Sequence, residues 1–262
     1  MSAPGKFTGS EISRSGSSPP SIQAAASSAT STAAAPISNQ FLRIRPVTRN
    51  LSLILRPAAL AQPVSATIGR AAMEDDETTL SSGEIAALAR RIDRPVVLVG
   101  MMGVGKSSVG RKLANILHLP FADADDEIET AAQMPIPEIF STYGEPYFRD
   151  GERRVIARLI GEGPVKIIAT GGGAFCNSET RALILDKAIA IWLDSDIETL
   201  IERTGRRDNR PLLKQGDPRE ILTRLRAERE QFYTQAPIHV KSSSGPHHRM
   251  TTRVLRGLEA WL

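Results

Sequence analysis

The sequence predicts an α/β fold in which a parallel sheet is covered by helices on both faces. From residue 83 onward, short apolar runs of strand length alternate with longer segments whose apolar residues recur at helical spacing. A glycine-rich stretch, residues 100–108, joins the first apolar run to a helical segment. Strands connected through helices run parallel, because each crossover brings the chain back to the edge of the sheet where the previous strand began.

The elements are assigned in order along the chain. Strands are expected at 95–100, in the first part of 120–132, and at 165–170, 188–194 and 238–242. Helices are expected at 83–92, 106–119, after a turn in 120–132, and at 137–144, 145–163, 178–187, 196–204, 218–236 and 251–262. Pro146 suits the first turn of its helix, and Ser178 is expected to cap another. Residues 205–217 form a polar, basic loop, and the sequence contains no internal repeat.

The first 72 residues differ in composition from the rest of the chain. They are rich in Ser, Ala and Pro and carry seven Lys/Arg and one acid, for a net charge of +6. Residues 73–262 carry 26 basic and 28 acidic residues, for a net charge of −2. Three interpretations stay open: an organellar transit peptide, a disordered extension, or a start codon assigned too early. We expect a disordered low-complexity leader at 1–72, a linker and short helix at 73–93, and the folded domain at 94–262.

Composition also excludes several classes of function. The overall charge of +4 comes from the leader, so it does not indicate a nucleic-acid partner. Cys176 is the only cysteine, which rules out an internal disulfide and fits a reducing compartment. The four His and one Cys lack metal-ligand spacing, and no apolar stretch reaches the length of a membrane span. We expect a cytoplasmic protein with no membrane partner, or a plastid protein if the leader is a transit peptide.

The glycine-rich stretch matches the pattern G-x-x-x-x-G-K-[ST]. In such a P-loop, glycines let the backbone wrap tightly, so that successive N–H groups point at phosphate oxygens. The helix that follows adds its positive N-terminal end. Lys106 would reach the outer phosphates and Ser107 would ligate Mg²⁺, so the cofactors implied are ATP and Mg²⁺. The residues expected to hold the nucleotide here are Gly103, Val104, Gly105, Lys106, Ser107 and Ser108.

Five further motifs follow the P-loop in order, namely FADADDEIE (121–129), FRDGE (148–152), ATGGGA (169–174), RRDNRPLL (206–213) and RAEREQFY (226–233). Together they resemble shikimate kinase over residues 94–262. The resemblance implies transfer of the γ-phosphoryl group of ATP to the 3-hydroxyl of shikimate, a step toward chorismate and the aromatic amino acids. It also implies a monomer with the nucleoside-monophosphate-kinase-like P-loop fold: three layers, a five-stranded parallel sheet of order 2-3-1-4-5, a lid and a substrate-binding region.

On the acceptor side, the resemblance implies that Arg149 and Arg229 bind the shikimate carboxylate, for which the planar guanidinium is well shaped. It makes Asp125 the base that contacts the shikimate hydroxyls and Asp123 a Mg²⁺ ligand. Residues i and i+2 of a strand face the same side, so both aspartates are expected to face one site. A helix-capping cluster shared with Asp126 and Glu127 is the alternative for them, and a solvated helix charge is the alternative for Arg149 and Arg229. The adjacent glycines that would approach the substrate closely are Gly171, Gly172 and Gly173.

On the nucleotide side, the resemblance makes Arg210 the lid arginine that closes onto the phosphates, and the catalytic set is then Asp125, Lys106 and Arg210. Arg203 is expected to pack on adenine, with Pro246 as a looser match for the opposite wall. Asp194 ends an apolar strand as a Walker B acid does, but we expect it to be structural.

Two aromatic residues, Phe140 and Phe148, fit the wall of the shikimate pocket or ordinary core packing equally well. One departure from the family pattern is the missing proline in the stretch that ends at Tyr233. Two other functions stay open: a P-loop kinase for another small molecule such as gluconate, and a non-catalytic relative that binds without turnover.

Overall fold

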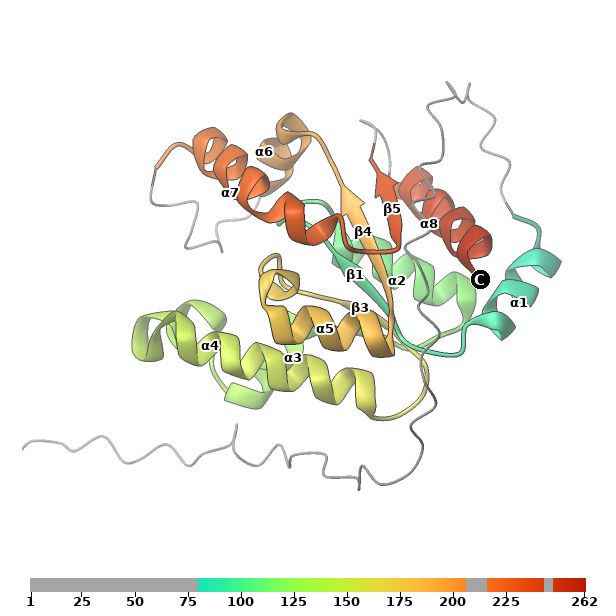
Figure 1. Cartoon of the computed structure of the whole chain (residues 1–262), viewed down its shortest axis with the longest axis horizontal. Coiled ribbons are helices and arrows are strands. Elements are labelled where there is room, and N and C mark those ends of the chain that lie inside the picture. The colour runs from blue at the N-terminus through green and yellow to red at the C-terminus, as the bar shows by residue number, and fades with distance from the viewer. Residues whose placement is uncertain (1–79, 206–215, 243–246) are drawn as a thin grey trace, which may run out of the picture. The chain divides into compact units, whose positions relative to one another are not determined.

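A computed structural model describes residues 80–205, 216–242 and 247–262 (Figure 1). The predicted leader, the lid arginine Arg210 and Pro246 lie outside these residues. Among the described residues, no helix is long and apolar enough to cross a membrane. The same part of the chain contains no cluster of three or more His, Cys, Asp or Glu arranged to hold a metal ion.

The sheet has five parallel strands in the order β2-β3-β1-β4-β5, which confirms the predicted topology. The central strands consist of apolar residues that are buried throughout, as expected where helices cover both faces. The short apolar runs in the sequence therefore predicted the central strands correctly. Their bounds are β1 Val96–Val99, β2 Phe121–Asp123, β3 Ile167–Ala169, β4 Ile189–Asp194 and β5 Ile238–Lys241.

Helices form a layer on each face of this sheet. In Figure 1, α1, α2 and α8 lie together on one side, and α4 and α5 lie on the other side of β1 and β4, with α6 and α7 beside the end of the sheet where β4 finishes. The helices are α1 Ser82–Arg91, α2 Lys106–Leu117, α3 Ala124–Ala132, α4 Ile136–Gly161, α5 Ser178–Lys187, α6 Ile197–Gly205, α7 Pro218–Tyr233 and α8 His247–Trp261, and a 3-10 turn, η2, spans Ala174–Cys176.

Four local expectations differ from the structure. Asn177, not Ser178, caps α5, and its side chain accepts a hydrogen bond from the Thr180 amide at 2.9 Å. No turn separates β2 from α3, because Asp123 is both the last residue of the strand and the N-cap of the helix. Helix α8 begins at His247, four residues before the expected start, and α7 ends three residues before the expected end.

The interruption inside α4 was predicted correctly. Gly144 has φ 79° and ψ 171°, which breaks the helix between the two segments that the sequence separates. Pro146 follows two residues later, in the first turn of the second segment. A backbone N–H at this position would have no hydrogen-bond acceptor within the helix, so proline loses nothing by lacking one. The break places Glu145 and Arg149 at the start of the second segment, next to the site described below.

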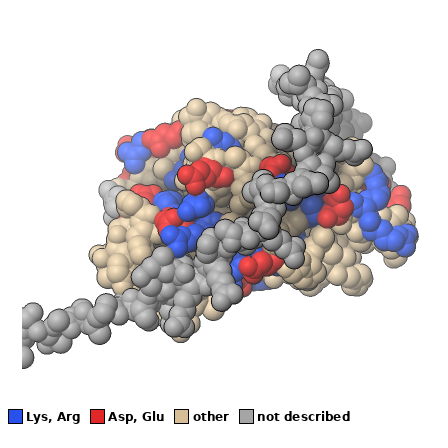
Figure 2. Space-filling model, turned by 60° about the horizontal axis from the view of Figure 1, so that its bottom comes forward, with Lys and Arg blue, Asp and Glu red and all other residues tan. Residues whose placement is uncertain are grey.

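Charges on the described surface are mixed. Figure 2 shows lysine and arginine side chains lying among aspartates and glutamates on the face in view. Charged residues of the described part of the chain form short ion pairs, such as Arg154 with Asp150 at 2.8 Å and Arg219 with Glu198 at 2.5 Å. Such pairs are individually weak at an exposed surface.

Candidate active site

The P-loop connects β1 to α2 at the carboxyl edge of the sheet. Gly100 has φ 135°, and a Cβ there would lie 2.2 Å from the backbone oxygen of Leu193 in the adjacent β4. No other residue fits this position, since both the backbone conformation and the close approach exclude a side chain. The loop therefore passes tightly against β4 before its amides turn toward the N-terminus of α2.

Lys106 is held over this loop. Its side chain is buried, and its Nζ donates to the carbonyl oxygens of Gly100 at 2.8 Å and Met101 at 2.9 Å. Ser107 and Ser108 follow in the first turn of α2 and are half-buried. The ammonium group and the helix N-terminus thus face the same loop, as phosphate binding requires.

The two aspartates come together for a different reason from the one the sequence suggested. Asp125 belongs to the first turn of α3, and Asp123 caps that helix by accepting a hydrogen bond from the Asp125 amide at 3.1 Å. Strand alternation was therefore the wrong argument for their placement, and the capping interpretation of Asp123 is correct. Asp125 still points toward the glycines after β3, because a Cβ on Gly171 would lie 3.1 Å from its Oδ1.

The environment of Asp125 makes it a weaker acid. Burial, followed by the nearby carboxylates of Asp123 and Glu152, raises the pKa of Asp125 to about 6, although the Lys106 ammonium acts in the opposite direction. Burial also raises the pKa of Glu152, against the lowering effect of Arg149. A carboxyl group with a pKa just below neutral pH is suited to accept a proton from a hydroxyl group.

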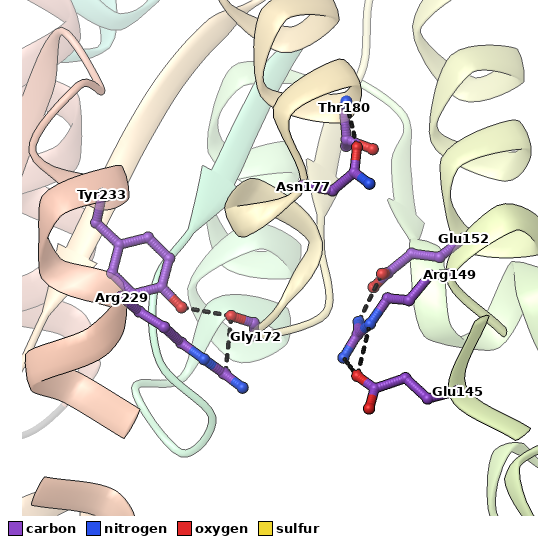
Figure 3. A network of polar contacts seen from close by, with 8 residues as sticks. All are labelled: Glu145, Arg149, Glu152, Gly172, Asn177, Thr180, Arg229 and Tyr233. Atoms are coloured by element: carbon purple, nitrogen blue, oxygen red, sulfur yellow. Dashed lines mark hydrogen bonds and ion pairs between the residues drawn. The ribbon is translucent and has the colours of Figure 1, made fainter. Parts of the chain in front are cut away.

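Arg149 lies on α4 between two glutamates of the same helix (Figure 3). Its Nη1 donates to Glu152 Oε2 at 2.7 Å, and its Nε and Nη2 donate to Glu145 Oε1 at 3.2 and 3.0 Å. The ring of Phe148 lies 5.1 Å from the guanidinium carbon. Sequence reasoning missed both glutamates, although their positions four residues before and three after an arginine on a predicted helix are a signal for side-chain pairing.

The glycine turn, residues 171–173, lies against these groups. A Cβ on Gly171 would lie 2.6 Å from Glu152 Oε1, and one on Gly173 would lie 2.8 Å from both terminal nitrogens of Arg149. A Cβ on Gly172 would lie 3.1 Å from the Met102 amide nitrogen in the P-loop. The three glycines therefore leave room for the acidic group, the arginine and the P-loop to approach one turn.

Arg229 and Tyr233 approach the same turn from α7. Arg229 Nη1 donates to the carbonyl oxygen of Gly172 at 3.2 Å, and the Tyr233 hydroxyl donates to that same oxygen. Figure 3 shows this pair facing the Arg149 network across Gly172. Arg229 is therefore not a solvated helix charge. The structure thus brings together the predicted substrate residues Asp125, Arg149 and Arg229, which we call the acceptor site together with the glycine turn.

The remaining predicted residues are placed as follows. Arg203 Nη1 donates to the carbonyl oxygen of Val104 at 3.2 Å, beside the P-loop. Burial alone would raise the pKa of Asp194, but the hydrogen bond to His239 and the charge of Arg226 lower it overall. These pairings agree with a structural role for Asp194.

The two candidate wall residues stack on each other. The rings of Phe140 and Phe148 lie 4.5 Å apart, and Phe148 is buried in the core. Core packing therefore accounts for Phe148, while its contact with the Arg149 guanidinium also leaves it beside the acceptor site.

A five-stranded parallel sheet, a P-loop and an acidic acceptor site flanked by two arginines define a P-loop kinase for a small molecule that carries an anionic group. Comparison with known proteins makes the assignment specific. The family model for shikimate kinase matches residues 102–259, and the chain belongs to the shikimate kinase family.

Curated relatives and solved structures agree with this assignment. A shikimate kinase from Novosphingobium aromaticivorans is 66% identical over 193 residues, which cover 72% of this chain and 100% of that protein. One from Caulobacter vibrioides is 55% identical over 165 residues, covering 63% and 82%. The structure of shikimate kinase from Acinetobacter baumannii in complex with shikimate is similar with a TM-score of 0.62 and 32% identity, covering 69% of this chain and 98% of that one.

Proposed function

We propose that this chain transfers the γ-phosphoryl group of ATP to the 3-hydroxyl of shikimate, giving ADP and shikimate 3-phosphate. The observation that carries the proposal is the meeting of Asp125, Arg149 and Arg229, from three different helices, at a glycine turn that touches the P-loop. The similarity to a kinase solved with shikimate supports the choice of acceptor.

The acceptor site would hold shikimate by its two ends. The guanidinium groups of Arg149 and Arg229 bind its carboxylate, and the glycine turn lets the ring approach the backbone closely. Asp125 then accepts the hydrogen bond of the 3-hydroxyl and takes its proton as the oxygen attacks phosphorus. With a pKa of about 6, Asp125 is mostly ionised at neutral pH and is ready to act as this base.

The nucleotide is held by the backbone amides of Gly103, Val104 and Gly105 and by the first turn of α2. Lys106 would move its donors from the loop carbonyls of Gly100 and Met101 to the outer phosphates. The roles of Arg203 on adenine and of Arg210 on the phosphates rest on their matches to the family motifs.

A magnesium ion fits the oxygen donors at this edge of the sheet. The Ser107 hydroxyl and the Asp123 carboxylate are hard ligands, and Mg²⁺ usually takes only one or two protein ligands besides phosphate and water. When bound, the ion neutralises phosphate charge as the transferred group moves. The second role of Asp123, capping α3, keeps its carboxylate at the start of that helix.

We also propose the catalytic unit, the oligomeric state and the compartment of the protein. The catalytic unit is the 94–262 domain, acting as a cytoplasmic monomer that needs neither nucleic acid nor a membrane. The slight negative charge of residues 73–262 and the mixed surface in Figure 2 support this proposal.

A coupled assay of ADP release tests the function directly. The full chain would be supplied with ATP and Mg²⁺ and offered shikimate, quinate or gluconate in separate reactions, with Lys106→Ala as the inactive control. We expect release with shikimate and much less with the other two acids. Release with gluconate alone would identify a different kinase, and ATP binding without turnover of any acid would identify a non-catalytic relative.

A further inference from the structure

We propose that Glu145 is a displaceable carboxylate that competes with the acid group of the substrate for Arg149 and thereby sets the affinity for shikimate. This inference rests on the proposed function, because it requires Arg149 to bind the substrate carboxylate. Glu145 is then a residue that controls specificity for an acidic acceptor without touching the reacting atoms.

The first observation is that every nitrogen of the Arg149 guanidinium already donates to a protein carboxylate. Nη1 is bonded to Glu152, while Nε and Nη2 share Oε1 of Glu145. The Nε–Nη2 edge of a guanidinium is one of the edges that bind a carboxylate with two parallel hydrogen bonds. Glu145 therefore places on Arg149 the same chemical group that the substrate brings.

The second observation is that the two glutamates differ in how easily they can leave. The Glu152 side chain is only 3% exposed, whereas that of Glu145 is 60% exposed. A buried ion pair is strongly destabilising to break, but an exposed i,i+4 pair contributes little and its partner can rotate into water. Glu145 also follows the break at Gly144, at the outer end of the second segment of α4.

The third observation is the balance of charge around Arg149. Arg149 with Glu145 and Glu152 carries a net charge of −1, which Arg229 across Gly172 only balances, so the two arginines offer a substrate anion no surplus positive charge until Glu145 moves away. Glu152 cannot move away from Arg149 in the same manner, since it stays buried beside Gly171. Glu145 competes with the substrate carboxylate for Arg149 and also repels it. Both effects lead to the same expectation, that removing the charge of Glu145 strengthens binding of the acid.

Steady-state kinetics of Glu145→Gln in the full chain test this inference. We expect KM for shikimate to fall about two- to fivefold, the range that an exposed ion pair supplies, with the change on KM rather than kcat. The methyl ester of shikimate, which carries no charge, should show no such gain. The matched control is Glu138→Gln, which removes the same charge from an exposed position in the first turn of α4 and should leave both KM values unchanged.

Three outcomes would overturn the inference. An unchanged or higher KM for shikimate in Glu145→Gln would mean that Glu145 does not compete, or that it orients Arg149 for the substrate. An equal gain with the methyl ester would show an effect unrelated to the acid group. If Arg149→Ala kept the wild-type KM for shikimate, Arg149 would not bind the carboxylate. Failure of the proposed function is distinct, because wild type would then release no ADP with shikimate at all.

Discussion

The nucleotide half and the acceptor half of this site are built in different ways. The P-loop is one contiguous stretch between β1 and α2, and its function depends on backbone amides and on one lysine held by the carbonyls of its own loop. The acceptor site gathers side chains from α3, α4 and α7 around a glycine turn after β3. Backbone geometry therefore determines the first half, and a network of paired charges determines the second.

Because of this difference, the acceptor half can change in evolution while the nucleotide half is retained. A P-loop binds phosphate in proteins with many acceptors, because it contacts what all nucleotides share. In the proposed function, acceptor specificity lies in Arg149 and Arg229, whose guanidinium groups donate to Glu145, to Glu152 and to the glycine turn. Substitutions in the two halves should consequently have different effects on stability and kinetics, and four experiments test that difference.

The largest effect is expected for Asp125→Asn. Removing the base should lower kcat by about 10²- to 10⁴-fold, while affinity for ATP stays near that of wild type, because the asparagine cannot accept the proton of the hydroxyl. Rapid-quench measurement of phosphoryl transfer, together with nucleotide titration, would check both parts. A variant that lost ATP affinity as well would indicate that the two halves are not separable at this residue.

The next effect contrasts two glycines. Gly100→Ala forces a Cβ against the Leu193 backbone at a strained φ and should destabilise folding by about 2–4 kcal/mol. Gly173→Ala meets only the flexible end of Arg149, so the fold should persist while KM for shikimate rises. Chemical denaturation and kinetics on both variants would test this, and equal losses of stability would contradict the contrast.

The sequence predicted the two halves unequally well. The P-loop was recognisable because its chemistry needs fixed residue types at fixed spacing, and buried strands such as Val96–Val99 were recognisable as continuous apolar runs. The acceptor residues were found only through motifs of a family, and the strand argument for Asp123 and Asp125 was wrong. Local spacing cannot show that a helix starts immediately after β2, because hydrogen bonding of the Asp123 side chain decides that boundary.

The partners of Arg149 show a second limit of prediction from the sequence. Glu145 and Glu152 stand among several charged residues on α4, and sequence alone does not distinguish a glutamate facing the glycine turn from one facing water. Their different burial arises from the packing of α4 against the turn, which is a tertiary property. Arg203 donates to the Val104 carbonyl oxygen of the P-loop, its expected contact with adenine stays a prediction, and Arg210 lies outside the described residues.

A third, smaller effect concerns stability and pH. Because burial raises the folded-state pKa of Asp125 from 3.8 to about 6, its ionisation opposes folding. The penalty is absent below pH 3.8, grows as the pH rises toward 6 and is constant above. Asp125→Asn should therefore be more stable than wild type at pH 7 by about 1–3 kcal/mol, equivalent to a few °C in Tm.

Thermal unfolding in the presence of EDTA, at pH values from 3.5 to 8, would measure this gain. The Tm values of the two proteins should converge as the pH falls below about 4, where wild-type Asp125 is protonated in both states. A gain that persists undiminished at pH 3.5 would show that the charge of Asp125 is not its cause.

The smallest effect is expected for Tyr233→Phe. The Gly172 carbonyl would lose one of its two donors but keep Arg229, so a neutral hydrogen bond of about 1 kcal/mol is removed. We expect KM for shikimate to rise about two- to tenfold with KM for ATP unchanged, because the glycine turn is less firmly held. A change in KM for ATP alone would assign Tyr233 to the nucleotide half.

A crystal structure of the full chain with ADP and shikimate would show directly whether the acceptor site holds its substrate as proposed. We expect the shikimate carboxylate to lie against the guanidinium groups of Arg149 and Arg229, and the 3-hydroxyl to lie within hydrogen-bond distance of the Asp125 carboxylate. Shikimate bound with its carboxylate away from both arginines, or with its 3-hydroxyl out of reach of Asp125, would overturn the proposed acceptor site.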